Sequence, residues 1–259
     1  MKYKFIFSMA IVAIGLSSCD SDRDDQPNEQ TWLVSKVTTI NSSMYGDGTD
    51  VIIYKYNDKS QIITIDEGDG SRIDFTYDSE GKPTKGMAYY DNVEVTQTYI
   101  YEDKKLTKSS SRSGNSFVDD TFYTYNSVGK LVDVKVCETP GCTRPYSTSF
   151  TYSGNNIITE LFTTSSSQSK YENTYTTNRS AYSYMNPYIR LLHSDAEVIS
   201  ENTIATEKYS SKYGDNNWSN GSTSTYTHKY NEQGMPIESV RKSADGTSTT
   251  KIVYEYIVR

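Results

Sequence analysis

Tyr54-Lys55-Tyr56-Asn57 reads aromatic residue, any residue, tyrosine and turn former, and this stretch decides the fold because the chain repeats it. The second tyrosines of the copies stand at positions 56, 77, 101, 125, 152, 230 and 256, so the steps are 21 to 27 residues except one of 78, which is three times 26. A fixed period of this length marks a repeated supersecondary unit. The further copies are Phe75-Thr76-Tyr77-Asp78, Tyr99-Ile100-Tyr101-Glu102, Tyr123-Thr124-Tyr125-Asn126, Phe150-Thr151-Tyr152-Ser153, His228-Lys229-Tyr230-Asn231 and, without a turn, Tyr254-Glu255-Tyr256.

Each copy predicts a strand with one buried face. Side chains alternate along a strand with a period of two, so both aromatic residues of a copy point to the same side. The same register adds Ile52, Ile73 and Ile252 to that side, while Lys55 and Glu255 fall on the other. This alternation is typical of an antiparallel sheet with one wet face.

The residues after the aromatic pair predict tight turns. Asp78-Ser79-Glu80-Gly81, Asn126-Ser127-Val128-Gly129 and Asn231-Glu232-Gln233-Gly234 each place Asn or Asp first and Gly fourth. That order suits a type I turn followed by a left-handed residue in a bulge. Each unit is therefore a hairpin. We expect an all-β fold, an antiparallel meander of repeated hairpins that forms a large curved sheet or a soluble barrel-like structure.

Turns in a meander alternate between the two ends of the sheet. The Asn/Asp turns all fall at one end, so the variable loops gather at the other, where they form a candidate recognition surface. These loops lie at 67–70, 90–93, 111–116, 138–144 and 243–246.

One helical signal interrupts the repeat between its fifth and sixth copies. Asn186 can cap a helix and Pro187 suits the first helical position, which predicts one short helix near 186–193. Ser194 with Glu197 forms a second capping box. We expect this segment to cover an open end of the sheet or barrel.

The first residues indicate export. A basic start and a short apolar run in residues 1–18 predict a signal peptide. The ending Leu16-Ser17-Ser18-Cys19 resembles a bacterial lipobox, which implies cleavage before Cys19 and attachment to a membrane through lipid on its thiol. Residues 19–30, acidic after Cys19, are expected to form a disordered tether, which leaves 31–259 as a single all-β domain.

The composition argues against one class of partner and predicts a core rich in tyrosine. The formal net charge is −7 and no basic cluster exists to neutralise phosphates, which argues against nucleic-acid binding. Tyrosine dominates the aromatic residues, with 24 against 7 Phe and 2 Trp. Because buried tyrosines need partners for their hydroxyls, we expect a hollow structure in which the ring is buried and the oxygen reaches water.

The remaining cysteines predict a small disulfide. Cys137 and Cys142 flank the turn Glu138-Thr139-Pro140-Gly141 in an exported chain, so a bond that clamps a hairpin loop is expected, with free thiols as the alternative. Neither has a paired Cys or His nearby, so we expect no metal site and no cofactor.

Two families resemble parts of this sequence. The units that begin at Phe75 and Tyr123 look like the Tyr-Asp repeats of Rhs-type shell proteins, although those shells use far more repeats. With the lipobox, the acidic tether and the Asn186-Pro187 helix, residues 31–259 more closely resemble Bacteroidetes lipoproteins that carry a domain of unknown function with a porin-like β fold. The resemblance implies the outer membrane and supplies no catalytic residue.

The acidic run after Cys19 also resembles the export signal of Bacteroidetes surface lipoproteins. This implies display on the cell surface, with the periplasmic leaflet as the alternative.

Signals for catalysis are weak. The only histidines are His193, at a helix end where a cation is favoured, and His228, which substitutes for an aromatic core residue. No nucleophile elbow accompanies them. Asp119 and Asp120 point to opposite faces of a strand and cannot form an acid/base pair. We therefore expect no enzyme.

Two acidic loops could offer oxygen ligands to calcium, or could simply be solvated turns. They are Asp47-Gly48-Thr49-Asp50 and Asp66-Glu67-Gly68-Asp69-Gly70.

These features favour a non-catalytic binding or scaffold lipoprotein that holds a glycan, a peptide or a partner subunit. The alternatives are a glycan-directed hydrolase on the β scaffold and a transmembrane barrel, which charged residues on one face and tyrosine-heavy strands disfavour. The candidate ligand contacts are aromatic residues expected to be exposed, namely Tyr89, Tyr90, Tyr182, Tyr184 and Trp218.

Overall fold

The computed structural model describes residues 30–43, 46–91 and 93–259. The chain divides into two units, Met1–Gln30 and Thr31–Arg259. The predicted signal peptide, Cys19 and all of the tether except Gln30 lie outside the described residues and stay predictions.

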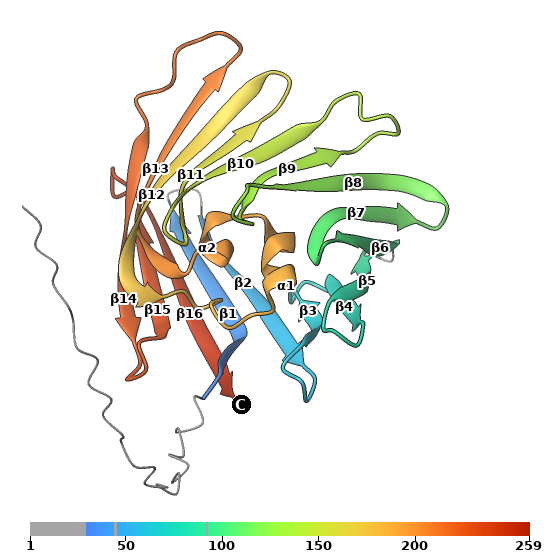
Figure 1. Ribbon diagram of the computed structural model, residues 1–259. Coiled ribbons are helices and arrows are strands. Elements are labelled where there is room, and N and C mark those ends of the chain that lie inside the picture. The colour runs from blue at the N-terminus through green and yellow to red at the C-terminus, as the bar shows by residue number, and fades with distance from the viewer. Residues whose placement is uncertain (1–29, 44–45, 92) are drawn as a thin grey trace, which may run out of the picture. The chain divides into compact units, whose positions relative to one another are not determined.

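The second unit is a closed antiparallel β-barrel in which each strand pairs with its neighbours in sequence and β1 pairs with β16 (Figure 1). This confirms the all-β meander and selects the barrel over an open sheet. Sixteen strands occur in the described part of the chain: β1 (Trp32–Ser43), β2 (Gly46–Tyr56), β3 (Ile62–Asp66), β4 (Arg72–Tyr77), β5 (Pro83–Tyr90), β6 (Val93–Glu102), β7 (Lys105–Ser113), β8 (Ser116–Tyr125), β9 (Leu131–Cys137), β10 (Tyr146–Ser153), β11 (Asn156–Thr163), β12 (Ser167–Arg179), β13 (Asn202–Tyr213), β14 (Ser222–Tyr230), β15 (Pro236–Lys242) and β16 (Ser248–Val258).

The barrel has two unlike ends. The Asn/Asp turns, which follow even-numbered strands, lie at one end, here called the turn end. The variable loops, which follow odd-numbered strands, lie at the other, the loop end, so their predicted gathering is confirmed. Both ends of the barrel sequence meet at the turn end, where the amide of Thr31 donates to the carbonyl of Arg259 at 3.1 Å.

The turns follow from their first and fourth residues. The side-chain oxygen of Asn126 accepts from the amides of Val128 and Lys130 at 3.1 and 2.9 Å, and Gly129 has a φ of 85°. Asn57, Asp78 and Asn231 do the same in their own turns. A bulge precedes the second tyrosine of each hairpin, as between Thr124 and Tyr125. The predicted turn and bulge are thus confirmed.

Several tyrosine hydroxyls donate to backbone carbonyls of the protein, where we expected the oxygen to reach water. Tyr125 on β8 donates to the carbonyl of Leu106 on β7 at 2.9 Å. Because the bulge recurs in each hairpin, the second tyrosine of several even strands reaches the same place, the first turn-end residues of the preceding strand. The equivalent pairs are Tyr56 with Val34, Tyr77 with Ile62, Tyr101 with Pro83, Tyr175 with Ile157 and Tyr256 with Pro236.

One predicted loop is a strand. We expected an acidic loop at Asp47-Gly48-Thr49-Asp50, but β2 begins at Gly46 and pairs with β1, with Asp47 opposite Ser42 and Asp50 opposite Thr39. Extended pairing spreads these carboxylates along a strand and removes the flexible loop that calcium would use. In residues 30–43, 46–91 and 93–259, no group of three or more His, Cys, Asp or Glu side chains is placed to hold a metal ion.

Residues 180–201, here called the plug, connect β12 to β13 and contain two short helices, α1 (Pro187–His193) and α2 (Ala196–Ile199). Asn186 caps α1, as predicted, by accepting from the amides of Tyr188 and Ile189. The second helix is capped by Asp195, whereas Ser194 ends α1 with a φ of 53°. Of the described residues, no helix is long and apolar enough to cross a membrane.

The plug lies inside the ring of strands instead of covering its end (Figure 1). Ile189 is 0% exposed and, with Tyr182 and Met185, packs among the inward aromatic residues of the repeat, such as Tyr54 and Tyr254. The repeat therefore turns its apolar face toward a core that the chain itself supplies.

Polar contacts fix the plug to the turn end of the wall. The side-chain amide of Asn186 donates to the carbonyl of Gly81 at 3.1 Å, and the hydroxyl of Tyr188 donates to the carbonyl of Lys104 at 2.8 Å. Within the plug, the guanidinium of Arg190 donates to the last carbonyls of α2, those of Val198 and Ile199, at 2.8 and 2.6 Å. These contacts hold the plug in the turn half of the barrel, where two grooves of about 460 and 280 Å³ remain beside Arg190.

Candidate functional site

Apart from the two turn-end grooves, two chambers lie beside the plug toward the loop end of the barrel. The wide chamber has a volume of about 490 Å³ and lies between α1 and strands β3 to β10. The acidic chamber has a volume of about 370 Å³ and lies between α2 and strands β11 to β15. Glu67 and Tyr146, beside loop-end connections, line the wide chamber, and Arg241, near the loop end of β15, lines the acidic one. Both volumes are in the range of small-molecule sites.

The wall of the wide chamber alternates aromatic faces with polar groups. Phe75, Tyr99 and Tyr123 belong to the repeat and bring their rings inward. The hydroxyl of Tyr99 donates to the side-chain oxygen of Gln97 at 2.8 Å, and that of Tyr123 lies 3.3 Å from the Ser109 hydroxyl. These bonds hold the polar groups in fixed positions before any ligand enters.

Gly86 makes room for one of these rings. A Cβ atom at this position on β5 would lie 2.6 Å from the hydroxyl of Tyr99, closer than real contacts allow. We did not predict a role for Gly86 from the sequence. The available signal was a glycine in mid-strand, which often marks a close approach of another group.

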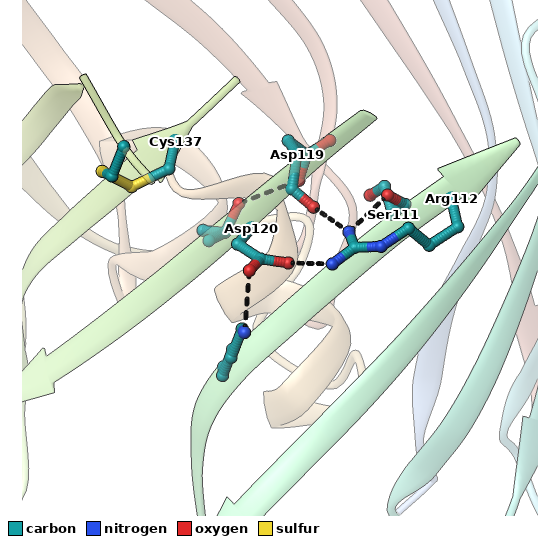
Figure 2. Close-up of polar contacts among 8 residues, drawn as sticks. Ser111, Arg112, Asp119, Asp120 and Cys137 are labelled. Atoms are coloured by element: carbon teal, nitrogen blue, oxygen red, sulfur yellow. Dashed lines mark hydrogen bonds and ion pairs between the residues drawn. A yellow bond between two sulfur atoms is a disulfide. The ribbon is translucent and has the colours of Figure 1, made fainter. Parts of the chain in front are cut away.

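Asp119 and Asp120 point to opposite faces of β8, as predicted (Figure 2). Asp119 lines the wide chamber, and burial raises the pKa of its carboxyl. Asp120 pairs with Lys108 and Arg112 at 2.8 and 2.9 Å, and these contacts lower its pKa although its partial burial acts in the opposite direction. Asp119 is thus available to a ligand in the wide chamber, whereas Asp120 belongs to an ion-pair network on the outer face.

Cys137 and Cys142 form a disulfide, with Cα atoms 4.8 Å apart (Figure 2). The bond closes the connection between β9 and β10 at the loop end, and Cys137 pairs with Asp120 across the neighbouring strands. It therefore constrains the rim next to the wide chamber.

The acidic chamber gathers four carboxyl groups with one guanidinium. The carboxylate of Glu160 accepts from the amide of Ala196 at 3.0 Å, and that of Glu197 accepts from the hydroxyl of Tyr254 at 3.0 Å. Burial is the main cause that raises the pKa of both groups to about 7. The remaining carboxyl groups are those of Asp195 and Glu207, and the guanidinium is that of Arg241.

Both histidines point into the interior of the barrel. His193, at the end of α1, lines the wide chamber, and burial lowers the pKa of its imidazole. Desolvation therefore outweighs the helix end, and our expectation of a favoured cation there is wrong. His228 contacts the Ser239 hydroxyl and the Ile204 carbonyl, each at 2.8 Å, and stacks on Tyr226, as a core substitution would.

The structure does not bring the five predicted aromatic contacts together. Tyr182 is only 7% exposed and packs against Tyr254, because the plug enters the core, so its expected exposure is wrong. Tyr90 is 38% exposed at the loop end. The other three lie beside cations at separate places, namely Tyr89 under Arg72, Tyr184 under Arg179, and Trp218 between Lys170 and Lys212.

Solved structures share this fold. The crystal structure of a porin-like protein from Bacteroides uniformis has a TM-score of 0.59 and 13% sequence identity, and the match covers 86% of this chain and 98% of that chain. A porin-like protein from Bacteroides vulgatus has a TM-score of 0.55 and 13% identity, with 87% and 99% covered. The architecture is therefore a porin-like β-barrel, which confirms the fold that the second resemblance implied. At this identity the likeness shows the fold alone.

The remaining comparisons give no further evidence about the fold. A TcdB2-TccC3-Cdc42 structure has a TM-score of 0.25 and is covered over 14% of its chain, so it supports no argument about the Rhs-type resemblance. No protein-family model and no curated protein matches this sequence.

Proposed function

We propose that this protein is a non-catalytic binding lipoprotein of the outer membrane, displayed on the cell surface through lipid on Cys19, that holds a small saccharide in the wide chamber. The observation that carries the proposal is the chamber itself. It is open toward the loop end, walled by aromatic rings and hydroxyl groups, and backed by the plug.

The plug supports a cup rather than a channel. Ile189 and Met185 are almost fully buried among the repeat aromatics, so protein occupies the lumen behind the wide chamber, and only grooves beside Arg190 remain at the turn end. A ligand that enters from the loop end would meet this packed floor. Retention, rather than passage, is the behaviour such a geometry favours.

The outer wall favours a tethered protein over a membrane-spanning one. Lys36 pairs with Glu255 at 2.8 Å, and Lys229 and Lys251 both pair with Glu238 at 2.7 Å, on the face opposite the inward tyrosines. A lysine or arginine on a lipid-facing wall costs about 2–4 kcal/mol near the bilayer centre, and an acidic residue costs less. Water is the more favourable environment for this surface.

The lining matches the chemistry of a sugar. Saccharides present apolar C–H faces and hydroxyl groups that both donate and accept hydrogen bonds. Tyr99 and Tyr146 offer ring faces, while Gln97, Thr121 and Asp119 offer donors and acceptors. A few polar groups among aromatic surfaces are typical of small-molecule sites.

A thermal-shift screen of the soluble chain from Asp20 to Arg259 against mono- and oligosaccharides tests the proposal. A ligand at 100 times its Kd adds about 2.7 kcal/mol to stability, so binding raises the Tm. Asp119→Asn with Tyr146→Ala should abolish the ligand-induced rise, whereas Asp120→Asn, next in sequence but on the outer face, should retain it. A flat screen, or a rise that persists in the double variant, would refute saccharide binding in this chamber.

A glycan-directed hydrolase is the second candidate. The observation in its favour is the pair of carboxyl groups with raised pKa values, Glu160 and Glu197, in the acidic chamber. It ranks second because each already accepts a hydrogen bond from the plug or wall. Hydrolysis of chromogenic glycosides that Glu160→Gln abolishes would establish it.

A further inference from the structure

We propose that the acidic chamber is a separate binding site for a small organic cation, a molecule with a primary ammonium group next to a hydroxyl, as in an amino sugar or amino alcohol. The inference is independent of what the wide chamber binds. It is carried by unpartnered polar atoms, by the balance of acceptors and donors, and by the shape of the lining.

The first observation is an unpartnered acceptor. Asn173 on β12 is 6% exposed and lines the acidic chamber, yet its Oδ1 atom has no hydrogen-bond partner. Its other amide atom, Nδ2, lies 3.4 Å from the carbonyl of Ile157. A buried acceptor without a donor costs about 1–3 kcal/mol. A ligand N–H group would satisfy it.

The second observation is an excess of acceptors. Glu160, Asp195, Glu197 and Glu207 contribute carboxyl groups, while Arg241 is the one cationic side chain among the lining residues. Arg241 is engaged by Glu207, since its Nη2 donates to Oε1 at 2.6 Å. An ammonium group has three donors and no acceptor, so it complements such a wall.

A free donor specifies the second part of the ligand. The Nε atom of Arg241 is buried and has no hydrogen-bond partner. It requires an acceptor, and a hydroxyl oxygen next to the ammonium group would supply one. A small molecule that carries both groups would therefore donate to Asn173 Oδ1 and accept from Arg241 Nε.

The lining favours an organic cation over a bare metal ion. Within the described parts of the chain, no three acidic or imidazole side chains are gathered closely enough to hold a metal. The acceptors instead surround a volume of about 370 Å³, and Tyr171 and Tyr226 add aromatic surface. Rings of this kind attract an ammonium group through cation–π contact.

The pKa values of the acidic chamber are consistent with a site for a cation. Burial raises the pKa of Glu160 because its charged form is poorly solvated. A cation within the chamber would stabilise that charged form. Glu207 is already compensated by Arg241, whereas Glu160 and Glu197 both have a pKa raised by burial and would both gain from a cation.

Glucosamine and glucose make a matched pair of probes, because they differ by an ammonium group in place of one hydroxyl. Isothermal titration calorimetry at pH 7 with the soluble chain should show glucosamine binding at least tenfold tighter than glucose. N-Acetylglucosamine, which lacks the positive charge, should behave like glucose.

Variants assign the difference to this chamber. Asn173→Ala and Glu160→Gln should each reduce the glucosamine preference to less than threefold, and a folded Asn173→Ala variant keeps the test valid if Glu160→Gln loosens the plug. Asp120→Asn, on the outer face of β8, should leave both affinities and the preference unchanged. Equal affinities in the unmodified protein, or a preference that survives Asn173→Ala, would overturn the proposal.

Discussion

The turn half and the loop half of the barrel are made from the same strands, yet the first is packed and the second holds open chambers. In the turn half, hydroxyl groups such as that of Tyr125 donate to backbone carbonyls, and the plug packs between the walls and leaves grooves beside Arg190. In the loop half, two chambers stay open, and carboxyl groups such as those of Asp119 and Glu160 line them. The repeat therefore supplies stability at one end, which leaves the other end free to carry a site.

The largest test of this comparison is the packing of the plug. Ile189→Ala removes a side chain that is 0% exposed, so we expect a loss of about 3 kcal/mol in the free energy of unfolding, measured by urea denaturation. Val136→Ala, on the half-buried wall of the wide chamber, should cost less than half as much because its neighbours already face open space. Equal losses would mean that the two halves are packed alike.

The second test is the pH dependence of stability that the acidic chamber creates. The pKa values of Glu160 and Glu197 are raised to about 7 in the folded state from 4.5, so the folded protein binds more protons than the unfolded chain between these values. Stability from these groups is therefore greatest below pH 4.5 and falls as the pH rises to about 7. His193 and His228, with lowered pKa values, act in the opposite direction as the pH drops below 6.5.

A double variant isolates the carboxyl groups. Glu160→Gln with Glu197→Gln keeps hydrogen-bonding capacity but cannot ionise, so its stability relative to the original protein should increase by about 3 kcal/mol for each carboxyl group between pH 4.5 and pH 8. Urea denaturation at four pH values measures this change. A difference that stays constant with pH would show that these carboxyl groups titrate normally and that the chamber is wetter than its geometry indicates.

The sequence predicted the turn half well because its determinants are local. Period-two alternation placed Tyr54 and Tyr56 on the inner face, the turn residues fixed the hairpins, and Asn186 with Pro187 located α1. Each of these signals lies within a few residues of the structure it specifies.

The loop half depends on contacts between distant residues, which one sequence does not reveal. Glu160 and Glu207 share a chamber only because β11, β12 and β13 pair side by side with one particular register. Burial of Tyr182 likewise required the plug to enter a closed ring. One signal was available: Asn173 stands between Tyr171 and Tyr175 on the inward face, where a polar residue needs a reason.

The third test concerns the tyrosine hydroxyls. Tyr125→Phe leaves the carbonyl of Leu106 without its 2.9 Å donor and should lower stability by about 1 kcal/mol. Tyr152 occupies the equivalent place in the next hairpin, and its hydroxyl makes no hydrogen bond with the described residues, so Tyr152→Phe is a matched control with almost no expected loss. If both variants lose the same amount, the recurrent bond contributes nothing to the turn half.

The smallest effect is expected from a turn in which serine takes the place of the fourth-position glycine. Ser60 and Gly129 hold the same place in their turns, and each donates its amide to the first turn residue at 3.0 Å, but Ser60 adopts a φ of 60° with a side chain. Ser60→Gly relieves about 1 kcal/mol of left-handed strain and loses slightly less through the freer unfolded chain, so a gain of a few tenths of a kcal/mol is expected. Gly129→Ser, where a Cβ atom would have room, should lose a similar amount. Paired urea titrations of the two variants measure both changes, and shifts of the same sign would show that backbone strain does not govern this position.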